Sequence, residues 1–301
     1  MSVRFGVAGT AYWAREVHVR GLMARPDVEL VGIWGRDVEA TRNMAGATGT
    51  RGFATFDEML AAVDAVSIAV APEAQPALAC AAARTGKHLL LEKPLALSVE
   101  TAASTADAIA KARVASVVFF MRRFVPIIER SIQEASHRRW KTASVRVHSA
   151  VLSSSTPFTN SRWRQQVGAE LWDIGPHVLS ILLPVLGPVL RIRAEQEPDG
   201  ISRFQTVHEG GATADVSLTL RAHPSDAGIV YRFDGDAGTL TLPEPTIARP
   251  EALSEAAGDL VRMIAGRETA HRCDAAFGLE VVRVLEAAQL SSERRQPVDL
   301  K

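Results

Sequence analysis

The chain opens on an apolar run that ends in a glycine turn: Val3-Arg4-Phe5-Gly6-Val7-Ala8-Gly9-Thr10-Ala11-Tyr12-Trp13-Ala14. The run has the composition of a short buried strand, and a helical pattern follows it at residues 16–25. A glycine turn between a strand and a helix is the place of the dinucleotide fingerprint GxGxxG. Because Ala11 and Ala14 replace the second and third glycines, the motif alone leaves an ordinary strand–helix turn equally open.

Strands and helices alternate from this turn to about residue 120. Near-continuous apolar runs predict strands at 3–8, 29–34, 65–70, 88–92 and 115–120, with helices between them at 16–25, 37–48, 56–62, 76–85 and 98–113. This order predicts a parallel sheet covered on both faces, which is a doubly wound α/β fold of the Rossmann type. Its binding crevice is expected at the carboxyl ends of the strands, where the sequence has Gly9, Gly35, Pro72 and Lys93.

The pattern changes after about residue 120. A helix at 125–135 precedes segments with strand-like alternation at 143–151, 190–197, 204–208, 213–221, 229–233 and 239–242, interrupted by one helix that starts at 174 or 176 and ends at 186. Helices at 252–265 and 275–291 close the sequence. We predict a second, α+β domain with a largely antiparallel, open-faced sheet and helices on one face.

Two domains are therefore expected. Residues 1–121 form the nucleotide-binding domain, and residues 122–301 form the domain for substrate binding and oligomerisation, whose last helix could pack back on the first domain. One face of the second sheet is apolar, since valines alternate with polar residues at 145, 147 and 151. A large uncovered sheet face would join copies into a homodimer or homotetramer.

The charge balance narrows the class of partner. The 301 residues include 34 Lys plus Arg and 34 Asp plus Glu, so a chain-wide basic field for nucleic acid is absent. The longest apolar run, near 178–190, is broken by a serine, a glycine and two prolines, which excludes a membrane span. Two distant cysteines, no zinc-ligand cluster and no signal-peptide pattern at the start lead us to expect a cytoplasmic protein without a metal.

The end of the second predicted strand bears on the choice of cofactor. A NAD site usually has an acidic residue there, whereas this sequence has Gly35, followed by Arg36 and Asp37. An arginine can pair with a 2′-phosphate, so we predict a preference for NADP over NAD. The alternative is that Arg36 is a solvated surface residue and Asp37 caps the following helix or takes the ribose.

Two further motifs connect the halves of the sequence. Glu92-Lys93-Pro94 ends an apolar strand, and Gly168-Ala169-Glu170-Leu171-Trp172-Asp173-Ile174-Gly175-Pro176-His177 lies far downstream. With the glycine turn, Arg122-Arg123-Phe124 and Asp274-Ala275-Ala276-Phe277-Gly278-Leu279, they resemble the Gfo/Idh/MocA family (glucose–fructose oxidoreductase, inositol dehydrogenase and relatives) over essentially the whole chain.

The resemblance implies an NAD(P)-dependent oxidoreductase that acts on a secondary alcohol or carbonyl of a sugar, inositol or related polyol. It implies that the catalytic residues are Lys93, Asp173 and His177. The residues expected at the cofactor are Gly9, Thr10, Ala11, Tyr12, Trp13, Gly35, Arg36, Asp37, Ala71, Pro72, Gln75, Glu92, Lys93 and Arg122. Three departures from the family pattern are Val167-Gly168-Ala169 in place of a glycine triplet, Ser180 in place of an acid, and Gln75 in place of a histidine.

The chemistry follows from the residue types as well. Hydride transfer from an alcohol needs a base for the hydroxyl proton, and the ordinary histidine pKa of about 6.5 suits His177 for that role. Asp173 stands four residues earlier, on the same face of a helix, and can orient the imidazole or hold a hydroxyl. Lys93 can stabilise developing alkoxide charge. Taken singly, these residues also fit a surface turn, a helix cap and a core histidine.

Other signals leave alternatives open. Trp163 and Arg164 could stack on and hydrogen-bond a sugar-like substrate, or they could pack within a loop. Arg122 could approach the cofactor or an anionic group, or it could form a surface salt bridge. A rival function on the same fold is a non-catalytic NAD(P)-binding sensor, because a fold does not fix a function.

Overall fold

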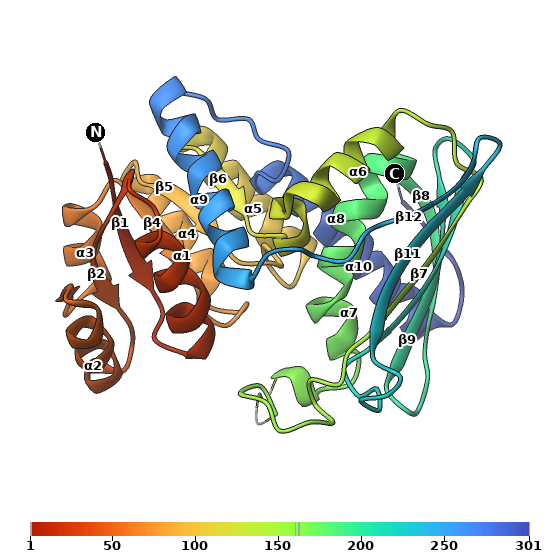
Figure 1. Ribbon diagram of the computed structural model, residues 1–301, viewed down its shortest axis with the longest axis horizontal. Helices are drawn as coiled ribbons and strands as arrows, with labels where there is room; N and C mark the ends of the chain where they lie inside the picture. The colour runs from red at the N-terminus through yellow and green to blue at the C-terminus, as the bar shows by residue number, and fades with distance from the viewer. Residues whose placement is uncertain (1, 160, 162, 301) are drawn as a thin grey trace. The chain divides into compact units, whose positions relative to one another are not determined.

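The computed structural model describes residues 2–159, 161 and 163–300 of the chain. They form two compact units, shown in Figure 1. The first unit is Met1–Val125 with Thr246–Leu279, and the second is Pro126–Pro245 with Glu280–Lys301. This division differs from the expected one at residue 121, because a segment late in the chain packs with the first unit.

The first unit contains a six-stranded parallel sheet in the order β3-β2-β1-β4-β5-β6. Its strands are β1 (Val3–Ala8), β2 (Val28–Trp34), β3 (Arg51–Gly52), β4 (Ala65–Ile68), β5 (His88–Leu91) and β6 (Ser116–Val118). The order with its reversal at β1 and β4 is that of the doubly wound fold, so the predicted class is confirmed. Only β3, a two-residue edge strand, was not predicted.

Helices connect these strands, and side-chain caps mark where several begin. They are η1 (Ala14–Val19, a π-helix) continuing into α1 (Arg20–Met23), α2 (Val38–Thr48), α3 (Phe56–Ala62), α4 (Gln75–Arg84), α5 (Val99–Ala112) and the 3₁₀ turn η2 (Met121–Phe124). Asp37, Thr55 and Ser98 each accept a hydrogen bond from a backbone N–H in the first turn of α2, α3 and α5.

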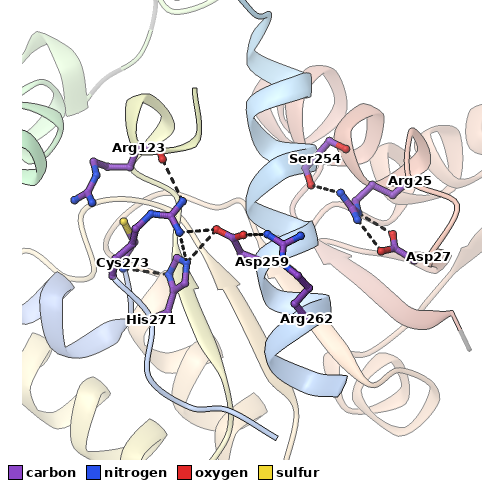
Figure 2. Close-up of polar contacts among 9 residues, drawn as sticks. Arg25, Asp27, Arg123, Ser254, Asp259, Arg262, His271 and Cys273 are labelled. Atoms are coloured by element: carbon purple, nitrogen blue, oxygen red, sulfur yellow. Dashed lines mark hydrogen bonds and ion pairs between the residues drawn. The ribbon is translucent and has the colours of Figure 1, made fainter. Parts of the chain in front are cut away.

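Helix α9 (Arg249–Gly266) is the part of the late segment that packs against the first unit. It lies against α1 at Gly21, where a Cβ atom would stand 2.7 Å from the carbonyl oxygen of Pro250 and 2.8 Å from Leu253. Arg25 adds a hydrogen bond of 3.0 Å to the carbonyl of Ser254 and an ion pair with Asp27 (Figure 2). The close approach of the two backbones explains why the segment belongs to this unit.

The second unit contains a seven-stranded sheet in the order β12-β11-β7-β10-β9-β8-β13. Its strands are β7 (Thr142–His148), β8 (Val189–Gln196), β9 (Ile201–His208), β10 (Thr213–Thr219), β11 (Gly228–Gly235), β12 (Gly238–Thr241) and β13 (Val298–Asp299). All neighbours are antiparallel except β7 and β10. The largely antiparallel sheet is as predicted, apart from the two-residue strand β13.

Helices cover one face of this second sheet. They are α6 (Pro126–Ser136), α7 (Ala169–Asp173), α8 (Gly175–Leu186) and the greater part of α10 (Ala275–Arg294), with α6 and α8 visible beside the sheet in Figure 1. The short 3₁₀ helix η3 (Trp163–Gln165) precedes α7 and contacts it. Val145, Val147 and Phe204 point into this buried side, whereas Ser144 and Arg146, next to them on β7, are exposed. The apolar face is therefore the covered one, and the open face is polar.

Candidate active site

The glycine turn after β1 is tightly closed against the neighbouring strands. Gly9 has φ +134°, a region that residues with a side chain rarely adopt, and a Cβ atom there would overlap the carbonyl oxygen of Ala69. Its N–H donates to Trp34 O at 2.8 Å, so the turn is fixed against β2. Ala11 and Tyr12 are exposed at the start of the helix. The turn fits a pyrophosphate group, which binds to backbone N–H groups at a helix N-terminus.

The end of β2 explains why residue 35 is a glycine. A Cβ atom on Gly35 would stand 2.6 Å from Thr10 Cγ2 and 3.2 Å from Thr41 Oγ1, so the position has no room for an acidic side chain. Arg36 and Asp37 are both exposed. The Asp37 carboxylate accepts from Ala40 N at 3.0 Å and caps α2, which is one of the two roles considered for it.

Lys93 lies in the turn that leaves β5, and its side chain is half-buried. The neighbouring Glu92 carboxylate is buried and accepts three hydrogen bonds. They come from Trp13 Nε1 at 2.7 Å, His18 Nε2 at 2.9 Å and the backbone N–H of Lys93 at 3.2 Å. The side chain of Glu92 is therefore engaged inside the protein, between the glycine turn and Lys93.

Gln75, at the start of α4, holds the same turn by its backbone. Its Oε1 accepts from Glu92 N at 2.7 Å, and its Nε2 donates to the carbonyls of Glu92 at 2.7 Å and Pro94 at 3.0 Å. The side chain is buried, with 1% of its surface exposed. A neutral histidine ring has one donor nitrogen and one acceptor nitrogen, and the tautomer decides which is which. A histidine at this position would therefore need one specific tautomer to both accept and donate as Gln75 does.

Sequence reasoning assigned no role to His18, yet the structure places it in this network. Its ring is fully buried, and Nδ1 lies 2.7 Å from Ser67 Oγ on β4. No local signal in the sequence could have identified the pair, because the bonded residues are 49 and 74 positions apart. A histidine in a predicted helix is ordinarily a surface or core residue without a role in a site.

Three other residues predicted at the cofactor differ in how far they are exposed: Ala71, Pro72 and Arg122. Ala71 is exposed and Pro72 is buried in the loop after β4. Arg122 is 7% exposed in η2, so it is not a surface residue. The exposed Arg249 at the start of α9 has its guanidinium carbon 5.5 Å from the centre of the Trp13 ring, a contact that the sequence did not reveal.

In the second unit Asp173 is held by an arginine. Arg164 donates from Nε to Asp173 Oδ2 at 2.7 Å and from Nη2 to Oδ1 at 3.3 Å, as a two-pronged pair. The guanidinium carbon lies 4.5 Å from the centre of the Trp163 ring and 4.6 Å from that of Phe158. The aromatic rings and the short helix η3 thus hold the Arg164 guanidinium in place. The guanidinium in turn holds the Asp173 carboxylate.

His177 follows Asp173 across a nearly continuous helical path. Asp173 is the last residue of α7, and Ile174, with helical φ −95° and ψ −40°, joins it to α8. The backbone bonds Ile174 N to Glu170 O and Val178 N to Ile174 O continue across the junction. Residues four apart on such a path point to one side. His177 is half-exposed, and its carbonyl accepts from Ser180 Oγ at 2.8 Å.

Lys93 belongs to the first unit, and Asp173 and His177 belong to the second. Among the described residues, no group of three or more His, Cys, Asp or Glu side chains is arranged to hold a metal ion. No helix in the same part of the chain has the length and apolar character needed to cross a membrane.

The fold and the glycine turn define a Rossmann nucleotide-binding protein with a second, open-sheet unit. Residues 3–120 match the model of the Gfo/Idh/MocA family, described as an oxidoreductase family with an NAD-binding Rossmann fold. Residues 3–120 are thus similar to the Gfo/Idh/MocA oxidoreductases, in agreement with the resemblance seen in the motifs.

Relatives by sequence carry related names. An uncharacterised oxidoreductase of Rhizobium meliloti is 40% identical over 101 residues, which is 33% of this chain and 30% of the relative's own length. A dTDP-3,4-didehydro-2,6-dideoxy-alpha-D-glucose 3-reductase of Streptomyces antibioticus is 29% identical over 261 residues, 80% of this chain and 75% of the relative.

A solved structure extends the likeness over the whole fold. Levoglucosan dehydrogenase in complex with NADH and L-sorbose superposes with a TM-score of 0.85 at 19% identity, covering 100% of this chain and 99% of that one. At this identity the likeness shows the fold alone.

Proposed function

We propose that the protein transfers a hydride between a nicotinamide cofactor and a secondary alcohol or carbonyl of a sugar, inositol or related polyol in the cytoplasm. The observation that carries the proposal is the pairing of a glycine turn after β1 with Lys93 after β5, at the carboxyl edge of one parallel sheet. The relatives named as a sugar reductase and a sugar dehydrogenase support this substrate class.

The proposed roles follow from the residue types and their contacts. When bound, the nicotinamide donates or accepts the hydride. His177 takes the hydroxyl proton during oxidation and returns it during reduction. Asp173, kept in place by Arg164, orients the imidazole or accepts from a substrate hydroxyl. The Lys93 ammonium stabilises negative charge on the substrate oxygen.

A substrate panel tests the proposal directly. The protein is mixed with NADPH or NADH and each of a series of ketoses, keto-inositols and keto-nucleotide sugars, and the loss of reduced nicotinamide is followed by absorbance. The reverse assay uses the oxidised cofactors with polyols. We expect turnover with at least one member of the series. Tight cofactor binding without turnover over the entire panel would instead favour the sensor function.

We propose further that NADP is preferred over NAD. The support is the exposed Arg36 beside a residue 35 that has no room for a carboxylate. The test is titration of the wild type and of Arg36→Ala with NADPH and NADH. We expect the substitution to weaken NADPH binding and leave NADH binding nearly unchanged. Equal dissociation constants for the two cofactors in the wild type would contradict the preference. NADH is the appropriate comparison, because a structurally similar protein binds it.

We propose that Trp163 and Arg164 serve the substrate through Asp173. The guanidinium of Arg164 already uses two N–H groups on Asp173, so the arginine sets the carboxylate that meets a substrate hydroxyl. Substituting Arg164→Lys keeps the charge but removes the fork. An increase in KM with this variant supports the role, whereas unchanged kinetics would contradict it.

We propose that the open face of the second sheet joins two or more copies of the chain. A groove of about 590 Å³ runs over this face, lined by polar residues of both charges that include Arg146, Arg193, Arg203, Glu195 and Asp215. Light scattering coupled to size-exclusion chromatography tests the assembly. A homodimer or homotetramer is expected, and a monomer at all concentrations would contradict it.

A further inference from the structure

We infer that Glu92 is a positioning residue that couples the glycine turn to Lys93, and that His18 is its buried support. The kinetic part of this inference rests on the proposed function, whereas the structural part concerns the first unit alone. Three N–H groups converge on the single carboxylate of Glu92.

The pattern of donors requires a carboxylate at residue 92. Trp13 Nε1 and His18 Nε2 both lie at Oε1, while the backbone N–H of Lys93 lies at Oε2. A carboxylate accepts at both oxygens, whereas an amide of the same shape donates at one of its two ends. In a glutamine at this position the amide NH₂ would therefore face another donor. That donor would be either the backbone N–H of Lys93 or the ring N–H groups of Trp13 and His18.

His18 and Glu92 are buried, so the hydrogen bond between them restricts the positions of both side chains. The side chain of His18 is 0% exposed and that of Glu92 is 12% exposed. Because a carboxylate can only accept hydrogen bonds, the bond with His18 requires the N–H of the ring to be at Nε2. Nδ1 then meets the Ser67 hydroxyl, which either donates or accepts, so the ring is fully hydrogen-bonded.

The network holds the segment on each side of Lys93. Gln75 binds the backbone of Glu92 at both its N–H and its carbonyl, and also the carbonyl of Pro94. Glu92 binds the N–H of Lys93 itself and, at its other oxygen, the indole of Trp13 in the glycine turn. Through these two bonds the Glu92 carboxylate links Trp13 to the residue that carries the ammonium group.

The first test measures the position of Lys93 without any substrate. Hydrogen exchange of the peptide that spans residues 89–97 is compared in the wild type and in Glu92→Leu, which has no acceptor at either position. Loss of the bond to Lys93 N is expected to raise exchange at that amide by about tenfold, the ratio that corresponds to one hydrogen bond. Exchange in helix α5 is expected to stay unchanged.

The second test uses two substitutions of the supporting histidine. His18→Gln retains an N–H donor that can reach Glu92, whereas His18→Leu has none. With a substrate from the panel, Glu92→Gln and His18→Leu are expected to lower kcat by up to about 100-fold with a smaller change in KM, since a small displacement of a catalytic group has that effect. His18→Gln is expected to recover most of the loss.

A buried polar residue elsewhere in the unit is the control for stability. Thr105 on α5 is 1% exposed and donates to Thr101 O at 2.8 Å. Thr105→Val changes the melting temperature without touching the network, so it is expected to keep wild-type kcat and wild-type exchange at Lys93.

The outcomes separate this inference from the proposed function. If the wild type turns over no member of the panel, the proposed function fails, and the exchange experiment still decides the role of Glu92. Wild-type exchange at Lys93 in Glu92→Leu would overturn the inference. So would equal losses of kcat in His18→Gln and His18→Leu that merely follow their losses in melting temperature.

Discussion

At the scale of residues, the turn after β5 determines where Lys93 lies. Its backbone is held in the turn after β5, and its side chain is half-buried at the carboxyl end of the sheet. Lys87 stands at the other end of the same strand, where its Nζ donates to Val63 O at 3.0 Å. The two lysines therefore form a matched pair for mutagenesis, one at each end of β5.

Replacing the lysine and the histidine tests the proposed catalysis. Lys93→Ala and His177→Ala are each expected to lower kcat by about 100- to 10,000-fold, because each removes a group that acts on the reacting oxygen or its proton. The dissociation constant for the reduced cofactor, followed by fluorescence titration, is expected to change little. Lys87→Ala should behave as the wild type. Turnover retained in both active-site variants would reject the assignment.

At the scale of elements, most helices and strands could be predicted, since their periodicity and caps are local. Thr55 and Ser98 cap α3 and α5, two helices that the sequence predicts, and the apolar runs of β1, β4 and β5 are buried strands. The two-residue strands β3 and β13 carry too little pattern to detect. The contacts of Glu92 with His18 are equally invisible, because they join residues far apart in the sequence.

Helix packing at Gly21 gives a prediction at this scale. Gly21→Ala is expected to reduce the stability of the first unit by about 1–3 kcal/mol, because the new methyl would press on Pro250 and Leu253. Gly46→Ala in α2 is the control, since no atom lies within 4 Å of the added methyl there. It should stabilise the helix by about 0.5–1 kcal/mol. Urea unfolding measures both, and equal changes would contradict this description of the α1–α9 contact.

At the scale of the whole molecule, a charged cluster completes the first unit. Asp259 of α9 binds Arg262, Arg272 and His271, and Arg272 donates to the carbonyl of Arg123 in η2 (Figure 2). Burial opposes ionisation of Asp259. The hydrogen bond from His271 and the charges of Arg272 and Arg262 outweigh it and hold its pKa below the ordinary value.

The lowered pKa predicts how stability depends on pH. A carboxyl group whose folded pKa is depressed stabilises the protein above its ordinary pKa of about 3.9, and this contribution is lost as pH falls through the folded pKa. Asp259→Asn should therefore be less stable than the wild type at pH 7, and the difference in melting temperature should shrink below about pH 4. A difference that stays constant across this range would contradict the prediction.

The division of the chain could not be predicted from the sequence, because it depends on contacts such as those of Gly21 and Arg25 with α9. It has a consequence for synthesis. The first unit consists of Met1–Val125 and Thr246–Leu279, so a ribosome must translate every strand of the second sheet except β13 before α9 emerges. Until then the side of α1 at Gly21 lacks its partner helix, and a chaperone could bind there while the rest of the chain is synthesised.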